Sequence, residues 1–219
     1  MKTYRIYLFR HGLTAGNFNA QYIGSTDEPL DPRGEAQLQK LCGAHPYPPV
    51  DAVFTSPLRR ARQSAAILYP NHSAIALDGL KECDFGEFEG KTAAELQGDA
   101  RFAKWLSGDL RARPPQGESG AEFTARVADA FEKIVDSMLK TGVESAAIVA
   151  HSGVLMTILA CYGLPEAPSA QWQMDPGYGF ALAVEPALWM RAKKLEVRDT
   201  APVPKIFADR GDTKTQPDA

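Results

Sequence analysis

The chain has 219 residues and a formal net charge of −3, and its scattered Lys and Arg residues exclude a broad basic face for nucleic acid. Its length fits one α/β domain, whose core can bury about 70% of the surface that the unfolded chain exposes. No segment approaches the roughly 18 apolar residues of a membrane span, so we expect a cytoplasmic protein without membrane contacts. The three cysteines lie too far apart in the sequence to predict a zinc site or a disulfide framework.

The first predicted element is a buried strand that ends in a polar triplet. Residues 4–9 are nearly all apolar or aromatic, and Arg10-His11-Gly12 follow without a break. In open α/β sheets, ligands bind at the carboxyl ends of the strands. We therefore expect Arg10 and His11 to face a cleft. A hydrogen-bonded structural histidine is the alternative for this triplet alone, so a catalytic interpretation needs partners elsewhere in the chain.

A polar loop, a helix and a second strand are predicted next. Residues 13–28 form a glycine-bearing segment that suits either close approach to a ligand or an ordinary surface loop. Asp31-Pro32 has the residue types of a helix cap and first turn. Residues 51–56 are typical of a second strand.

Two arginines follow this second strand. Ser56-Pro57 predicts that a helix begins at once, with Arg59 and Arg60 in or just after its first turn. Free N–H groups and forked guanidinium donors at such a position suit an anion such as phosphate. A salt-bridged surface arginine is the alternative.

A segment rich in carboxylates and glycine comes after a short predicted strand at residues 74–77. Within residues 80–90, Glu82 is a candidate proton donor if burial or a nearby anion raises its pKa. Taken singly, this glutamate and its acidic neighbours are also consistent with solvated side chains. We expect residues 83–118 to form a lid-like insertion over the sheet.

The second half of the chain predicts a long helix and a second histidine at the sheet edge. Ser119 and Glu122 match a capping box before an amphipathic helix. Residues 144–149 predict a buried strand, and His151 follows it as His11 follows the first strand, so the two can face each other. Residues 177–197 suggest a closing strand pair, and we interpret residues 200–219 as an arm or disordered tail.

Six ordered blocks of this sequence together resemble the histidine phosphatase, or phosphoglycerate mutase-like, superfamily. They are Leu8-Phe9-Arg10-His11-Gly12 with Thr14, Asn17 and Gly24; Leu30-Asp31-Pro32-Arg33-Gly34; Thr55-Ser56-Pro57-Leu58-Arg59-Arg60-Ala61; Glu82 with Phe85-Gly86-Glu87-Phe88-Glu89-Gly90; Gly117-Glu118-Ser119; and Val149-Ala150-His151-Ser152-Gly153.

This resemblance implies a three-layer α/β/α sandwich with a mostly parallel central sheet, formed by one domain at residues 1–199. It implies that His11 attacks phosphorus and that Glu82 acts as general acid and base. Phosphate or substrate binding would fall to a set that the family motifs identify: Arg10, Asn17, Gly24, Arg60, His151 and Ser152. The family match selects Arg60 over Arg59, because Arg60 directly precedes the aligned alanine. No metal or cofactor is expected, since arginines would supply the positive charge.

The segment after Glu82 is similar to the phosphatase branch, which acts on small-molecule phosphate esters. The compact length and the Gly-Glu-Ser block resemble α-ribazole-5′-phosphate phosphatases and also broad-specificity phosphatases. A cofactor-dependent phosphoglycerate mutase is the first alternative, although its adjacent arginine pair is not matched by Arg111 and Arg113. A non-catalytic phosphoester-binding or interaction domain is the second. A serine hydrolase is excluded, because no histidine follows Ser152. Oligomeric state is not predicted.

Overall fold

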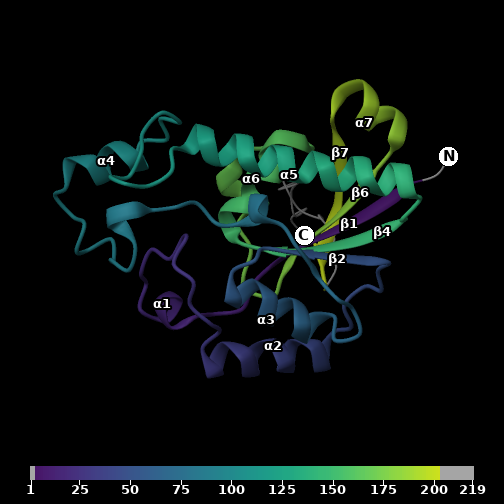
Figure 1. Ribbon diagram of the computed structural model, residues 1–219, viewed down its shortest axis with the longest axis horizontal. Coiled ribbons are helices and arrows are strands. Elements are labelled where there is room, and N and C mark those ends of the chain that lie inside the picture. The colour runs from purple at the N-terminus through teal and green to yellow at the C-terminus, as the bar shows by residue number, and fades with distance from the viewer. Residues whose placement is uncertain (1–2, 203–219) are drawn as a thin grey trace, which may run out of the picture.

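A seven-stranded sheet forms the centre of the computed structural model, which describes residues 3–202 (Figure 1). The strand order is β3-β2-β4-β1-β6-β7-β5. Among these described strands, only β6 runs antiparallel to its neighbours. The mostly parallel sheet is therefore confirmed. The strand bounds are β1 Tyr4–Arg10, β2 Ala52–Thr55, β3 Ile75–Ala76, β4 Ser145–Ala150, β5 Gly163–Leu164, β6 Gly179–Val184 and β7 Leu195–Ala201.

Helices cover both faces of this sheet, which confirms the three-layer prediction (Figure 1). Helices α2 (Pro32–Ala44) and α3 (Arg59–Leu68) lie on one face, where Leu38 packs in a core with Phe9 and Val53. On the other face lie α5 (Gly120–Thr141) and α6 (Ser152–Tyr162), and the expected apolar side of α5 is buried there. The remaining helices are α1 (Ala15–Phe18), α4 (Ala100–Leu106) and α7 (Pro186–Ala192).

The pairing of β1 with β4 fixes the position of both histidines. The two strands are parallel neighbours, and their register places Arg10 opposite Ala150. The next residue of each chain segment is a histidine, so His11 and His151 leave the sheet side by side at its carboxyl edge.

Two helix caps were predicted correctly and one was not. The Asp31 side chain accepts from the Arg33 N–H, and Ser119 and Glu122 form the expected capping box of α5. Ser56-Pro57 does not start α3, which begins at Arg59 without a side-chain cap. The Ser56 hydroxyl does accept from the Leu58 N–H, at 3.3 Å, but the helix begins only at the residue after Leu58.

The last part of the chain is more elaborate than the predicted strand pair. Strands β6 and β7 do pair antiparallel, but α7 connects them and β5 pairs with β7. Strand β7 continues to Ala201, two residues beyond the domain boundary expected after residue 199. The rest of the expected arm, residues 203–219, lies outside the described residues.

The insertion at residues 83–118 contains α4 and an aromatic cluster. Phe88, Leu96 and Phe102 are buried, and Tyr22 and Trp105 pack against them. The aromatic side chains therefore pack the insertion together. Helix α4 and the adjoining loops extend away from the sheet in Figure 1. Within residues 3–202, none of the helices has the length and apolar composition needed to span a membrane.

Candidate active site

His11 and His151 face each other at the carboxyl edge of β1 and β4. Their ring centroids are 5.0 Å apart in an edge-to-face arrangement, and both side chains are buried. The His11 backbone N–H donates to the Ala150 carbonyl at 2.9 Å, which joins the two strand ends. Nδ1 of His11 lies 2.6 Å from the Gly12 carbonyl oxygen. Because a carbonyl only accepts, Nδ1 carries the proton and Nε2 keeps a free lone pair.

Arg10 and Arg60 are held beside the histidines by backbone carbonyls. Arg10 donates from Nη1 to the Met174 carbonyl at 2.9 Å. Arg60 is fully buried and donates to the Thr26 and Gly24 carbonyls at 2.7 and 2.6 Å. Neutral carbonyls orient the guanidinium groups without neutralising their charge, so both arginines remain able to attract an anion.

Arg59 differs from Arg60 in orientation, although both belong to the first turn of α3. Arg59 is exposed, and its backbone N–H donates to Asp27. The buried arginine is therefore the one that the family match selected.

Two serines support this arrangement, and neither was among the site residues predicted from the sequence. The Ser56 hydroxyl lies 2.8 Å from His151 Nε2 and also accepts from the Leu58 N–H just before α3. The Ser64 hydroxyl accepts from the Gly12 N–H at 2.9 Å and donates to the Arg60 carbonyl at 2.6 Å. Ser56 belongs to a block that signalled the family, but Ser64 carried no sequence signal.

Glu82 is buried at the amino-terminal end of α6. One carboxylate oxygen accepts from the Cys83 N–H at 3.0 Å, and the other accepts from the Gly153 N–H at 2.9 Å. A Cβ added at Gly153 would lie only 2.4 Å from Glu82 Oε1. Glycine is thus required here because the carboxyl group approaches the helix backbone closely.

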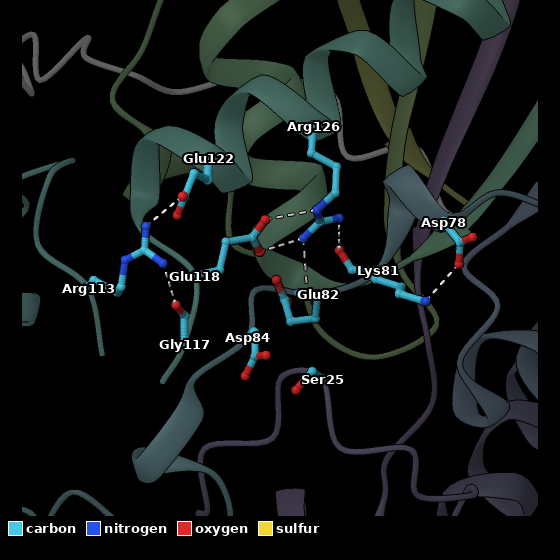
Figure 2. Close-up of a pocket in the computed structure, with 10 residues that line it drawn as sticks. All are labelled: Ser25, Asp78, Lys81, Glu82, Asp84, Arg113, Gly117, Glu118, Glu122 and Arg126. Carbon is cyan, nitrogen blue, oxygen red and sulfur yellow. Dashed lines mark hydrogen bonds and ion pairs between the residues drawn. The ribbon is translucent and has the colours of Figure 1, made fainter. Parts of the chain in front are cut away.

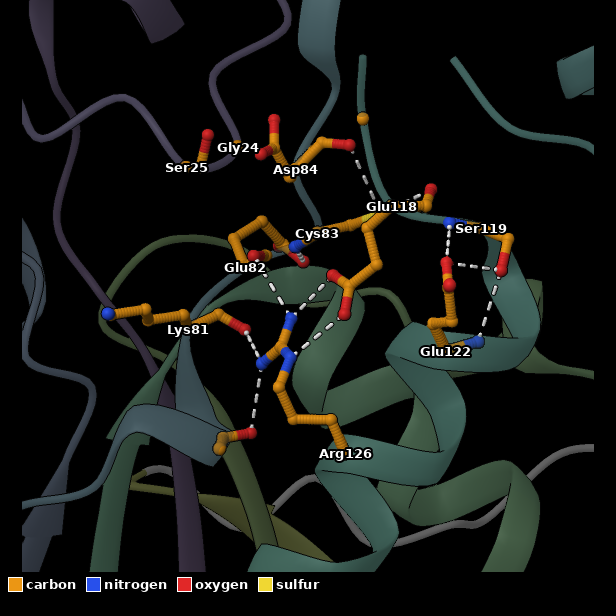
Figure 3. A network of polar contacts seen from close by, with 12 residues as sticks. Gly24, Ser25, Lys81, Glu82, Cys83, Asp84, Glu118, Ser119, Glu122 and Arg126 are labelled. Atoms are coloured by element: carbon orange, nitrogen blue, oxygen red, sulfur yellow. Dashed lines mark hydrogen bonds and ion pairs between the residues drawn. The ribbon is translucent and has the colours of Figure 1, made fainter. Parts of the chain in front are cut away.

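Arg126 of α5 holds the backbone on both sides of this glutamate (Figure 3). Its guanidinium donates to the carbonyls of Gly79, Lys81 and Glu82. It also forms a two-pronged ion pair with the Glu118 carboxylate at 2.9 and 2.6 Å. This pair connects the start of α5 to the segment that carries Glu82.

Glu89 organises the loop that anchors Arg60. Its carboxylate accepts from the backbone N–H groups of Gly24, Ser25, Thr26 and Phe85. The hydroxyls of Ser25 and Thr26 add two further hydrogen bonds. The sequence favoured a solvated side chain for Glu89 taken singly, whereas the structure gives it a central structural role in this loop.

Three of the predicted binding residues have other contacts in the structure. The Asn17 side chain forms a reciprocal cap with Thr14 at the start of α1. The Ser152 hydroxyl lies 3.7 Å from the Met156 sulfur. Gly24 contributes its carbonyl to Arg60, and a Cβ there would lie 1.9 Å from the Cys83 carbonyl oxygen. A direct phosphate contact for these three residues stays a prediction.

Burial sets the protonation states of the central groups. It lowers the pKa of His11 well below 6.5, and the charges of Arg60 and Arg10 lower it further. Burial also lowers the pKa of His151, with contributions from His11 and the same arginines. For Glu82, burial raises the pKa above its ordinary 4.5 and outweighs the opposing hydrogen bonds and arginine charges.

A pocket of about 500 Å³ opens beside Glu82 (Figure 2). Its walls come from residues 78–82, the insertion, the start of α5 and Ser25. The lining residues are Ser25, Asp78, Lys81, Glu82, Asp84, Arg113, Gly117, Glu118, Glu122 and Arg126. The site thus combines a neutral imidazole with a free lone pair, two arginines, a protonatable carboxyl group and space beside that group. Within residues 3–202, no cluster of His, Cys, Asp and Glu is arranged to hold a metal ion.

Comparisons with known proteins show which sequences and structures this chain is similar to. The family model of the histidine phosphatase superfamily (branch 1) matches residues 6–183. An adenosylcobalamin/alpha-ribazole phosphatase of Salmonella typhimurium is 30% identical over 188 residues, which cover 82% of this chain and 90% of that protein. A 2,3-bisphosphoglycerate-dependent phosphoglycerate mutase of Bifidobacterium longum is 29% identical over 190 residues, covering 72% of this chain and 76% of the mutase. The alpha-ribazole phosphatase structure from Shigella flexneri has the same fold, with a TM-score of 0.72 and 24% identity, covering 89% of this chain and 94% of that one.

Proposed function

The chain belongs to the histidine phosphatase superfamily (branch 1), and from that membership we propose that it is a phosphomonoesterase that uses a phosphohistidine intermediate on His11. Its substrate is a small-molecule phosphate ester, for which the Salmonella relative makes α-ribazole 5′-phosphate the first candidate. The observation that carries the proposal is the hydrogen bond from His11 Nδ1 to the Gly12 carbonyl. It leaves Nε2 unprotonated and ready to attack phosphorus.

The reaction has two steps. In the first, the Nε2 lone pair of His11 forms a bond to phosphorus while the bond to the ester oxygen breaks. Glu82, whose pKa is raised above 4.5 by burial, gives a proton to the leaving oxygen. In the second step, the Glu82 carboxylate takes a proton from water, whose oxygen forms a bond to phosphorus while the bond from phosphorus to His11 Nε2 breaks. Phosphate then leaves and His11 and Glu82 return to their initial states.

Three buried nitrogens can stabilise the charge that moves across the phosphoryl oxygens. They are Nε of Arg10, Nε of Arg60 and Nδ1 of His151, and none of them has a hydrogen-bond partner within the described residues. Buried polar groups are normally satisfied, so these donors fit a bound dianion. His151 can donate from Nδ1 if its Nε2 accepts from the Ser56 hydroxyl, which the 2.8 Å contact allows. The arginines would supply the charge that metal ions supply in other phosphoryl-transfer sites.

The test is hydrolysis of p-nitrophenyl phosphate in excess EDTA by the intact protein and by His11→Ala. We expect turnover to survive chelation and to fall at least ~10³-fold in the variant, because the nucleophile is lost. His45→Ala, at the end of α2 and outside the site, is the matched control and should keep full activity. A His11→Ala protein with undiminished turnover would rule out the mechanism, and loss of wild-type turnover on chelation would rule out its metal independence.

A further inference from the structure

The pocket beside Glu82 is the place for the leaving group if the proposed function holds. Glu82 belongs to the proposed catalytic set and also lines this pocket. A general acid must reach the oxygen that it protonates, so the alcohol part of the ester has to extend from phosphorus past Glu82. The side chains of the pocket therefore contact the leaving group. This step rests on the proposed function.

Arg126 has no N–H group left for a substrate anion. A guanidinium carries five N–H donors, and Arg126 makes five hydrogen bonds within the protein. Two go to the Glu118 carboxylate and three go to the carbonyls of Gly79, Lys81 and Glu82. An anion in the pocket would have to replace one of these bonds.

The other two cations of the pocket are each paired with a carboxylate. Lys81 pairs with Asp78 at 2.7 Å, and Arg113 pairs with Glu122 at 2.5 Å. The three ion pairs stand around the pocket in Figure 2. Among the described lining residues, each cation already has a carboxylate partner, so a second anionic group on the substrate would compete with that carboxylate.

Asp84 remains as a carboxylate without a cation. Its side chain accepts from the Gly86 N–H at 2.9 Å, and it forms no ion pair with another described residue. It is half-buried in the pocket wall, near Ser25 in Figure 2. We propose that the leaving group of the natural ester carries no second anion and offers Asp84 a hydrogen-bond donor, a hydroxyl or an ammonium group. Phosphoglycerates and bisphosphates are then poor substrates, which separates this protein from a mutase.

Three phosphate esters of equal length test the charge preference. They are O-phosphoethanolamine, 2-hydroxyethyl phosphate and 2-phosphoglycolate, whose leaving groups are cationic, neutral and anionic near pH 7. We expect kcat/KM for the first two to exceed that for 2-phosphoglycolate by about fivefold or more, the factor that ~1 kcal/mol of charge interaction produces. Asp84→Asn keeps a side-chain acceptor for Gly86 and removes the charge. This substitution should lower the ratio of kcat/KM for O-phosphoethanolamine to kcat/KM for 2-phosphoglycolate by a similar factor.

A second variant tests the paired arginine. Glu122→Gln retains a capping residue for α5 but removes the charge partner of Arg113. The value of kcat/KM for 2-phosphoglycolate, relative to that for 2-hydroxyethyl phosphate, should therefore rise several-fold. Asp129→Asn is the matched control, because this exposed carboxylate on α5 pairs with Lys133 outside the pocket; it should leave all ratios unchanged.

The outcomes distinguish the two proposals. Hydrolysis of p-nitrophenyl phosphate together with equal or better use of 2-phosphoglycolate would overturn the leaving-group inference and leave the phosphatase proposal intact. Unchanged ratios in Asp84→Asn would exclude Asp84 as the recognition group. Absence of turnover on every ester, including p-nitrophenyl phosphate, would overturn the proposed function and this inference with it.

Discussion

The position of one proton on His11 determines whether this residue can act as a nucleophile. An imidazole that is protonated on both nitrogens has no lone pair to offer. Burial and two neighbouring arginines disfavour that state, and the Gly12 carbonyl selects the tautomer with Nε2 free. The arginines proposed to bind the phosphate would therefore also keep the nucleophile neutral, so one pair of side chains would serve two purposes.

Glu82→Gln should separate the two steps of the reaction. The amide can neither protonate a leaving oxygen nor take a proton from water. Because p-nitrophenolate leaves readily without a proton, we expect a rapid burst of about one equivalent, followed by turnover that is slowed at least ~10²-fold.

Rapid mixing with p-nitrophenyl phosphate would measure the burst. A chemically quenched sample should contain acid-labile phosphate on the protein. With an alkyl phosphate, whose oxygen needs the proton, the same variant should show no burst. Full steady-state turnover on the alkyl ester would contradict the role of Glu82.

At the scale of elements, the loop at residues 24–26 connects a carboxylate to the phosphate site. Glu89 holds the N–H groups of this loop, and the carbonyls of the same loop hold Arg60. A change in the position of the Glu89 carboxylate therefore shifts the loop, and with it the guanidinium group of Arg60.

Glu89→Ala should consequently affect both stability and activity. Several backbone donors would lose their acceptor, so we expect the free energy of unfolding to fall by about 1–3 kcal/mol. Displacement of Arg60 should lower kcat/KM on p-nitrophenyl phosphate by ~10-fold or more. Glu87→Ala, an exposed neighbour that pairs with Arg101, should change stability by less than ~0.5 kcal/mol. Equal effects of the two substitutions, measured by urea unfolding and steady-state kinetics, would contradict this description.

The amino-terminal end of α6 offers a second comparison. Gly153→Ala places a methyl group against the Glu82 carboxylate, so we expect kcat/KM on an alkyl phosphate to fall ~10- to 100-fold. Gly43→Ala in α2 meets no atom within 4 Å and should stabilise the protein by about 0.5–1 kcal/mol with unchanged kinetics. A Gly153→Ala enzyme with normal activity would show that Glu82 has room to move.

These elements also show what the sequence can and cannot predict. Strand ends and helix caps depend on residues close in sequence, so the placement of His11 beside His151 was predictable. The contacts of Ser64 and Glu89 join segments 52 and 65 residues apart, and local pattern carries no information about such distant pairs. The contact of Ser56 with His151 was not predicted, because a Ser-Pro pair is a common helix start and this contact is tertiary. Helix α7 was missed for lack of a clear periodic pattern.

At the scale of the whole molecule, two neutral buried histidines make folding depend on pH. The unfolded chain binds a proton at each histidine as the pH falls below about 6.5, whereas the folded protein resists protonation of His11 and His151. Between 6.5 and the lowered folded pKa, the unfolded state holds more protons, so stability decreases as the pH falls. Glu82 acts in the opposite direction, because its raised pKa lets the folded state bind a proton first, from that pKa down to 4.5.

Because two histidines act against one glutamate, we expect the free energy of unfolding to decrease as the pH falls from 6.5 to 5. Each histidine contributes at most ~1.4 kcal/mol per pH unit to this decrease. Urea unfolding of wild type and His11→Asn across this range would measure it. The asparagine amide can still donate to the Gly12 carbonyl but cannot take a proton, so the slope should become shallower. A slope unchanged by His11→Asn would mean that His11 accepts a proton in the folded state as readily as in the unfolded chain, and the neutral nucleophile on which the mechanism depends would then be absent at mildly acidic pH.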